Sequence, residues 1–359
     1  MGDEVYYRLS KALDTLPNGF PSTDSGIEIK ILKKIFTLDE ADLFCDLRLT
    51  PETAEQIAKR TGRRIEGLEE KLVKMGKRGE IDSSISGGVK TFNMIPWIFG
   101  IYEYQNSRMD KEFAEMCEEY SMHWGAQFIS YGPQLMQVIP IEKEIPVKQE
   151  ALTYNQVSSL IDNSKSFMVT ECICKKKQGL LDNPCDKPTE VCMGMNSEPG
   201  YYEESDWGGR VITSEEAYEV LGMAEKAGLV HMTSNVEIGH GYICNCCGCC
   251  CGLLKAVSMG FPNVVNSYYY ALIDPGLCDA CGICIEERCQ VNAIEQVEDS
   301  YRIIKDKCIG CGLCVTTCPT EAIQLLRKEQ EDIVLPVKDE EVWFEERARQ
   351  RGVDYSAYR

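Results

Sequence analysis

The chain of 359 residues lacks the features of several common protein classes. It has no apolar run near the eighteen residues that a membrane-spanning helix needs, and Met1-Gly-Asp-Glu lacks the basic and apolar regions of a signal peptide. It has only 3 histidines and no recognisable nucleophile–base pair. The pair Gly208-Gly209 lacks the strand–glycine–helix context of a phosphate loop. We therefore expect a cytoplasmic protein without a membrane span, and nothing indicates a flavin or a nucleotide.

Positive charge is also scarce. The chain has 38 Lys and Arg against 57 Asp and Glu, a formal net charge of −19. Such a surface repels phosphates over most of its area, which makes nucleic acid an unfavourable partner. An acidic face suits an electron carrier that docks on a basic patch, and simple solubility is the alternative explanation.

Cysteine, in contrast, is abundant, with 20 residues. Adjacent and CxxCxxC spacings suit metals better than disulfides and favour a reducing compartment. Eight cysteines form two repeated motifs: Cys278-x2-Cys281-x2-Cys284-x4-Cys289 and Cys308-x2-Cys311-x2-Cys314-x3-Cys318-Pro319. Thiolates at this spacing hold three corners of a 4Fe–4S cubane, and a more distant cysteine closes the fourth. A zinc ribbon would use two CxxC pairs and no third cysteine in each triplet.

The two motifs belong to an internal repeat. A β-prone run precedes each, Tyr268–Ile273 in one half and Tyr301–Ile304 in the other. Residues 268–327 resemble the two-cluster bacterial ferredoxin family, in which the fourth cysteine of each motif ligates the other cube. The resemblance implies one cluster held by Cys278, Cys281, Cys284 and Cys318, and a second held by Cys308, Cys311, Cys314 and Cys289. The first motif departs from the family pattern because Gln290 stands where proline would follow the last cysteine.

The N-terminal third predicts a winged helix. Thr53, with Gln56 three residues later, is typical of the start of a helix, and Gly62 marks the end of that helix. A second helix follows, with Ile65, Leu68, Leu72 and Met75 at helical spacing, and then a hairpin around Gly87-Gly88. Basic residues slightly outnumber acidic ones between 52 and 80, yet Glu66, Glu69 and Glu70 lie on the would-be recognition helix. We therefore favour a protein-docking or scaffold role over DNA binding.

Several segments between and after these units are expected to pack in cores. A helical stretch over 107–131 carries Cys117, and Cys45 lies in an apolar segment; we interpret both as buried apolar thiols. A helix is expected at 214–226, and one at 342–349 whose Trp343 packs back on the body. His231 and His240 could ligate a metal near the cysteines that follow them.

Ten further cysteines lie in the middle of the chain and predict additional metal sites. They are Cys172, Cys174, Cys185, Cys192, Cys244, Cys246, Cys247, Cys249, Cys250 and Cys251. Two cubanes would use eight of them and one cubane would leave six spare, so one or two additional iron–sulfur clusters are expected, with the pairing open. Zinc, which also accepts four thiolates, and a non-cubane cluster at Cys246-Cys247-Gly248 remain alternatives.

The whole chain is similar to iron–sulfur proteins of strict anaerobes that join a winged-helix N-terminus, a cysteine-rich middle and a C-terminal two-cluster ferredoxin. The resemblance is carried by Thr53–Ala58, Gly100–Glu103, Glu171–Lys175 with Cys185–Pro188, Ala227–His231 and Ile243–Cys251. It implies an α+β protein with a winged-helix-like domain at 1–100, a helical connector at 101–150, a mixed helical cysteine-rich domain at 151–266, a ferredoxin-like two-cluster domain at 267–327 and a tail with a short helix at 328–359.

Three functions follow as hypotheses. The first is an electron-transfer subunit that relays single electrons through several 4Fe–4S clusters to or from a larger anaerobic redox enzyme. The second is a redox- or iron-responsive winged-helix transcription regulator, and the third a cluster-based reductase acting at the middle cysteines. The cysteine pattern favours the subunit over a stand-alone enzyme, with a redox protein or oxidoreductase complex as partner, and it allows an oligomer.

Overall fold

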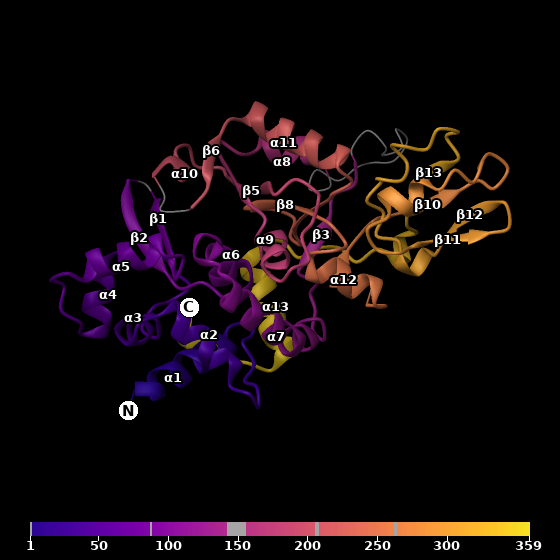
Figure 1. Ribbon diagram of the computed structural model, residues 1–359. Coiled ribbons are helices and arrows are strands. Elements are labelled where there is room, and N and C mark those ends of the chain that lie inside the picture. The colour runs from indigo at the N-terminus through magenta and orange to yellow at the C-terminus, as the bar shows by residue number, and fades with distance from the viewer. Residues whose placement is uncertain (1, 87, 142–155, 205–207, 262–263) are drawn as a thin grey trace.

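The computed structural model describes residues 2–86, 88–141, 156–204, 208–261 and 264–359 (Figure 1). The predicted boundary at 150–151 and Gly87 of the predicted hairpin lie outside the described residues. A helical N-terminal part, a central sheet and a C-terminal unit of small sheets follow one another, and the C-terminal unit lies at the end of the molecule away from the N-terminus (Figure 1). Within the described ranges no helix is long and apolar enough to cross a membrane.

The N-terminal part contains the helices and the hairpin that the sequence predicts. Its elements are α1 (Gly2–Thr15), α2 (Ile27–Ile35), α3 (Leu38–Phe44), α4 (Ala54–Thr61), α5 (Leu68–Lys77), β1 (Asp82–Ser86) and β2 (Val89–Asn93). Thr53 and Gln56 cap α4 reciprocally, each side chain accepting from the other's backbone N–H. Ile65 differs from the expectation because it precedes α5 and is 42% exposed.

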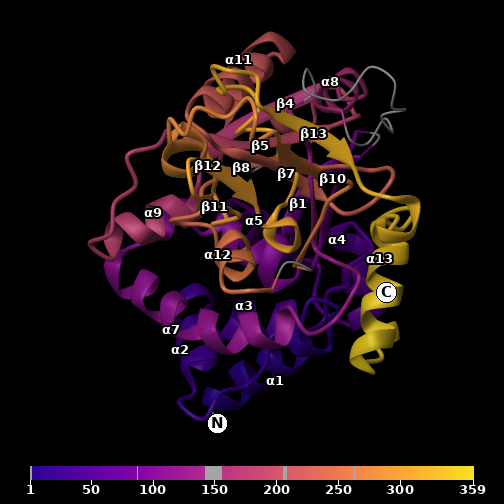
Figure 2. The same cartoon turned by 90° about the vertical axis from the view of Figure 1, so that its right-hand side faces the viewer.

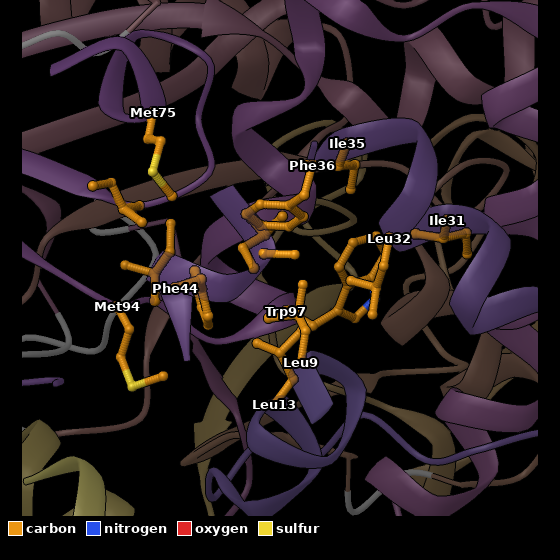
Figure 3. Packing of buried hydrophobic residues seen from close by; sticks show 14 of the residues in the cluster. Leu9, Leu13, Ile31, Leu32, Ile35, Phe36, Phe44, Met75, Met94 and Trp97 are labelled. Atoms are coloured by element: carbon orange, nitrogen blue, oxygen red, sulfur yellow. The ribbon is translucent and has the colours of Figure 1, made fainter. Parts of the chain in front are cut away.

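One apolar core holds these helices together and extends beyond them. Figure 3 shows Leu9, Ile31, Phe36 and Trp97 among its members. The turns η1 (Trp97–Ile101), α6 (Tyr102–Tyr104) and η2 (Asn106–Arg108) lead into α7 (Lys111–Phe128), whose Phe113, Cys117 and Tyr120 join the same core. Cys117 is buried as predicted, and burial raises the pKa of its thiol to about 12. Cys45 is half-buried at the margin of this core.

A seven-stranded sheet forms the centre of the molecule (Figure 1). In spatial order its strands are β6 (Arg210–Ile212), β4 (Ser166–Glu171), β5 (Glu190–Asn196), β8 (Tyr242–Cys246), β7 (Val230–Ser234), β3 (Met136–Val138) and β9 (Val265–Asn266). Neighbours are antiparallel except β3 and β9. The sequence predicted a mixed helical domain here and missed the sheet, because its strands are short and rich in Cys, Met, Gly and Asn, which carry a weak strand signal.

Five helices accompany the sheet: α8 (Val157–Asp162), α9 (Ile173–Leu180), α10 (Tyr201–Glu204), α11 (Ser214–Lys226) and α12 (Gly252–Ser258). The helix α11 has the predicted bounds, and Thr213 caps it with Glu216. Its Ala217, Val220, Leu221 and Ala224 are buried and pack with Val169 and Met193 of the sheet. Cys172 and Cys251 are the N-cap residues of α9 and α12, so the sheet and these helix starts bring cysteines to the same region.

The C-terminal unit contains two antiparallel strand pairs. The strand β10 (Tyr269–Ile273) pairs with β13 (Ile323–Arg327), and β11 (Ile294–Val297) pairs with β12 (Ser300–Ile303). The predicted β-prone runs are thus found as β10 and β12. The short turn η6 (Cys284–Arg288) lies in the first cysteine motif, and the short turn η7 (Lys305–Lys307) directly precedes the second motif.

The chain end returns to the body through η8 (Gln330–Asp332), α13 (Glu340–Arg351) and η9 (Ser356–Tyr358) (Figure 2). Trp343 is 5% exposed and donates its Nε1–H to Gln134 O at 2.9 Å, so the prediction that it packs back is confirmed. Arg347 is buried and donates to carbonyl oxygens of Phe128 and Tyr131 at the end of α7. These contacts tie the last helix to α7 and the segment that follows it.

Candidate iron–sulfur centres

The first candidate centre is a partly enclosed cavity in the C-terminal unit. Cys278, Cys281 and Cys284 line it from the loop after β10, and Cys318 lines it from the second motif. The remaining wall is mainly apolar, with Ile273, Ile283, Tyr301, Ala322 and Ile323. Cys281 is exposed and Cys284 is buried, so one side of this cavity lies close to solvent.

The second candidate centre is a partly enclosed cavity lined by Cys308, Cys311, Cys314 and Cys289. Two backbone groups donate to its sulfurs: Ala271 N lies 3.4 Å from Cys308 Sγ and Ala293 N lies 3.2 Å from Cys289 Sγ. Hydrogen bonds to the sulfurs are one of the means by which a protein tunes a cluster's potential. Each cavity therefore collects three cysteines of one motif and the distant cysteine of the other.

Both cavities share one small apolar core. Cys284 and Cys314 are buried in it together with Ala271, Ile294 and Ile323. The thiols of Cys278, Cys289, Cys308 and Cys318 pack against the same core. The two candidate centres thus adjoin one apolar core.

The middle cysteines divide into two groups. The larger group has six: Cys172, Cys174, Cys192, Cys244, Cys246 and Cys251. They come from the end of β4, from α9, β5 and β8, and from the start of α12. Their thiols contact one another in series, and hydrogen bonds from Cys174 and Cys192 hold the pKa of Cys172 well below its usual range.

The smaller group is Cys185, Cys247, Cys249 and Cys250, whose four sulfurs all lie within 4.8 Å of one another. Cys185 Sγ is 3.8 Å from Cys247 Sγ and 3.5 Å from Cys249 Sγ, and Cys249 Sγ is 3.6 Å from Cys250 Sγ. A tight turn holds three of them, because the N–H groups of Cys250 and Cys251 both donate to Cys247 O. The run from Cys244 to Cys251 is therefore shared, with three cysteines going to each group.

Part of the six-cysteine group lies in the same core as the second cavity. Cys246 and Cys251 are buried in it with Val230, Met232 and Leu313. Ile309 belongs to this core too, and Cys289, Cys308 and Cys311 pack against it. Ile141 N donates to Cys311 O at 3.0 Å, so the central sheet region directly contacts a loop that lines the second cavity.

The histidines take no part in either thiol group among the described residues. His231 Nδ1 lies 2.5 Å from Asn245 Oδ1, and Asn245 Nδ2 donates to Val191 O at 2.6 Å, which joins three strands of the sheet. Burial lowers the pKa of His240 to about 4, and its Nδ1 faces the hydroxyls of Thr233 and Ser234 at 3.4 Å. Both are structural side chains in this arrangement.

Two comparisons with known proteins find iron–sulfur relatives. A family model described as a 4Fe-4S binding domain matches residues 301–324, which contain Cys308, Cys311, Cys314 and Cys318. The protein named Ferredoxin 7Fe of Hydrogenibacillus schlegelii is 39% identical over 54 residues, which make up 15% of this chain and 68% of that protein. The chain belongs to the ferredoxin family. No solved structure matches it significantly.

The ferredoxin unit suits a 4Fe–4S cluster chemically. Each cavity offers four thiols and an apolar wall, and the second adds N–H donors to sulfur. Burial raises the pKa of Cys284 to about 11 and that of Cys311 to about 12, so these thiols hold their protons at neutral pH until a metal displaces them. Iron binding and proton release are therefore coupled in this unit.

Two functional side chains were not singled out from the sequence. Lys175 is 3% exposed and donates to Asn245 O at 3.3 Å. Burial opposes its charge, but the thiolates of Cys172 and Cys247 raise its pKa, which places a cation between the two middle groups. The Cys-Ile-Cys-Lys sequence could have indicated this role of Lys175, because a lysine next to metal-ligand cysteines can balance their charge.

Arg288 is the second missed residue, and it fastens the ferredoxin unit to the central sheet region. It is 6% exposed and donates to Leu313 O within the unit at 3.1 Å. It also donates to Glu225 O at 2.9 Å and to Lys226 O at 3.1 Å, at the C-terminal end of α11. A guanidinium there satisfies helix carbonyls that would otherwise lack partners.

Gln290, the departure from the ferredoxin pattern, has a structural explanation. Its Oε1 accepts from Gly248 N at 3.0 Å, inside the turn that carries Cys247 and Cys249. A Cβ at Gly248 would lie only 2.2 Å from Gln290 O, so the two backbones are in direct contact. A proline at 290 could not make the side-chain bond, and Gln290 therefore joins the ligand loop of Cys289 to the middle cysteines.

Proposed function

We propose that the chain is an electron-transfer protein or subunit that relays single electrons through several 4Fe–4S clusters to or from a larger redox enzyme. The ferredoxin unit holds two clusters in crossed pairing: Cys278, Cys281, Cys284 and Cys318 ligate one, and Cys308, Cys311, Cys314 and Cys289 ligate the other. The six-cysteine group of the central part holds at least one more. An enzymatic reaction at the chain itself is not needed for this role.

The observation that carries the proposal is the continuity of the apolar cores. Cys246 and Cys251 share a core with Ile309 of the second cavity and with Leu313 of the second cysteine motif, and the two ferredoxin cavities share another. Three centres therefore follow one another, from the six-cysteine group through the second cavity to the first. Centres that adjoin the same apolar cores are placed to pass electrons in succession, and hydrogen bonds and burial set the potential of each.

The outer end of this series has a surface suited to a partner. Cys281 is exposed, and Leu272 and Leu277 near the first cavity are 50% and 52% exposed. Asp274 and Asp279 lie beside them and are exposed as well. Apolar contact with an acidic rim fits a redox partner that presents a basic patch, since complementary charge speeds association.

We propose a winged helix for the N-terminal part, with a docking or scaffold role. Four of the eight basic side chains between 52 and 80 are engaged within the unit: Arg60 pairs with Glu52, Arg63 with Asp42 and Asp46, Lys71 with Asp39, and Arg78 with Glu40. Neutralised cations offer little attraction to phosphates. This pairing supports protein contact over DNA contact.

A regulator remains the second candidate because the N-terminal core contacts the metal region. Ile173, between Cys172 and Cys174, is buried in that core. Asn106 Nδ2 donates to Glu171 O at 2.5 Å, and Lys176 Nζ donates to Asn106 O at 2.7 Å. A structural change at the six-cysteine group would therefore alter these contacts with the N-terminal part. A specific DNA gel shift that is lost on cluster oxidation would favour this candidate.

Iron and acid-labile sulfide per chain test the relay. Anaerobically prepared wild type is expected to contain about twelve iron and twelve sulfide, four of each per cluster. Cys246→Ser combined with Cys251→Ser should retain about eight of each, and Cys45→Ser should retain all of them. A wild-type chain with only about eight iron, unchanged in the double variant, would restrict electron transfer to the ferredoxin unit.

A further inference from the structure

The four sulfurs of Cys185, Cys247, Cys249 and Cys250 are spaced as around one metal ion. A tetrahedral thiolate site with metal–sulfur bonds of about 2.3 Å has sulfur–sulfur edges of about 3.8 Å. The sulfur–sulfur distances are 3.8 Å for Cys185–Cys247, 3.5 Å for Cys185–Cys249 and 3.6 Å for Cys249–Cys250. Three edges thus agree with a single central ion to within about 0.3 Å.

The ferredoxin cavities show how a cluster site differs. There, four cysteines line each cavity, but their sulfurs are not all within 4.8 Å of one another. A cubane needs this wider spacing because its iron and sulfide atoms stand between the thiolates. Among the described residues, Cys185, Cys247, Cys249 and Cys250 are the one set whose ligand atoms all lie within 4.8 Å of one another. The spacing of this set suits one ion and not a cubane.

The local chain favours this compact set. The turn from Cys247 to Cys250 directs three thiols to one point, while Cys251 turns away to join Cys246. Cys185 reaches the point from the loop after α9, and its neighbour Lys187 is fixed by donating to Ala227 O at 2.7 Å. Lys175 supplies a buried cation near Cys247. One divalent ion with four thiolates carries a charge of about −2, which this lysine partly balances.

We propose that Cys185, Cys247, Cys249 and Cys250 bind a single tetrahedral metal ion, Zn²⁺ in the first place, and no iron–sulfur cluster. Tetrahedral sulfur coordination selects zinc or iron, and zinc has no redox chemistry. The site therefore fixes the loop at Cys185 to the turn before α12 and lies outside the electron path. Because Gly248 of this turn contacts Gln290, the ion also stabilises the contact between the turn and the ferredoxin unit.

The test is metal and sulfide analysis of the full chain, with Cys185→Ser plus Cys249→Ser compared with the control Cys45→Ser. We expect about one zinc per wild-type chain, a fall of at least fivefold in the double variant, and iron and sulfide unchanged in both. The reduced-state EPR signal of the ferredoxin clusters reports whether the variant is folded. Loss of about four iron and four sulfide with the zinc content unchanged would overturn the proposal.

Cobalt substitution gives a second, independent readout. Co²⁺ added to zinc-depleted chain should give the intense visible bands of a tetrahedral tetrathiolate, absent in the double variant. Chain produced with iron and without zinc distinguishes the two ions: a mononuclear iron–thiolate spectrum without extra sulfide retains the single-ion site, whereas additional sulfide contradicts it. These results are independent of whether electrons pass along the ferredoxin series.

Discussion

Gly310, in the loop that lines the second cavity, is the position where one added methyl group has the clearest consequence. A Cβ there would lie 2.1 Å from Tyr269 O and 2.3 Å from Tyr269 C. Tyr269 is the first residue of β10 and pairs with Arg327 of β13. Because the obstacle is backbone in a paired strand, Gly310→Ala must displace either the strand or the cysteine loop.

The internal repeat supplies a matched control. Gly310 has a φ of 57°, and so does Ala280 at the corresponding place in the first motif. The first half thus accepts a Cβ in this left-handed conformation, and the difference between the halves is the contact with Tyr269. We expect overpacking to cost about 1–3 kcal/mol in Gly310→Ala, in addition to about 1 kcal/mol for the left-handed backbone. Ala280→Gly should change stability by less than about 1 kcal/mol.

The assay is the iron content after anaerobic isolation and the rate of iron release to a chelator. Gly310→Ala should lose the cluster of the second cavity, about four iron per chain, or release its iron at least tenfold faster than wild type. Ala280→Gly should behave as wild type. If Gly310→Ala keeps its iron and its release rate, the close approach to Tyr269 does not control this loop and the reasoning is refuted.

Three other changes probe the junctions of the molecule. Arg288→Ala leaves buried carbonyls without a donor, so we expect about 3 kcal/mol less stability and faster hydrogen exchange at the end of α11, partly restored in Arg288→Lys; unchanged exchange would contradict this. Lys175→Met should lower the reduction potential of the cluster in the six-cysteine group by tens of millivolts, measured by EPR-monitored titration, while Lys175→Arg stays near wild type. His240 has a folded pKa of about 4, below the unfolded value of about 6.5. The stability that the neutral imidazole contributes to the folded state is therefore present above pH 6.5 and is lost as the pH falls from there toward 4. Wild-type stability relative to His240→Gln should therefore drop by about 2 kcal/mol from pH 7.5 to 5, and a constant difference would refute the assignment.

The cysteine spacing of the C-terminal unit could be interpreted from the sequence because its ligands lie within short loops. The helix start at Thr53 was equally accessible, since its capping partner Gln56 is three residues away. The division of the middle cysteines could not be obtained in this way. It depends on strand register, for example Cys192 opposite Thr170, and on a turn that sends Cys250 and Cys251 in different directions.

Contacts between distant segments were also inaccessible. Gln290 was noticed only as a missing proline, and its bond to Gly248 bridges 42 positions of sequence. Arg288 reaches the end of α11 across 63 positions, and no local pattern indicates that partner. Both contacts depend on how the ferredoxin unit packs against the central sheet region.

The most direct test of the relay is freeze-quench EPR of the full chain after rapid mixing with a limiting one-electron reductant. We predict that clusters of the ferredoxin unit are reduced first, and that the electron then reaches a third cluster whose signal is absent when Cys246 and Cys251 are replaced by serine. Magnetic interaction between neighbouring reduced clusters should broaden the signals at full reduction. Electrons that remain on the ferredoxin clusters in wild type and in the double variant alike would contradict a relay through the central part of the chain.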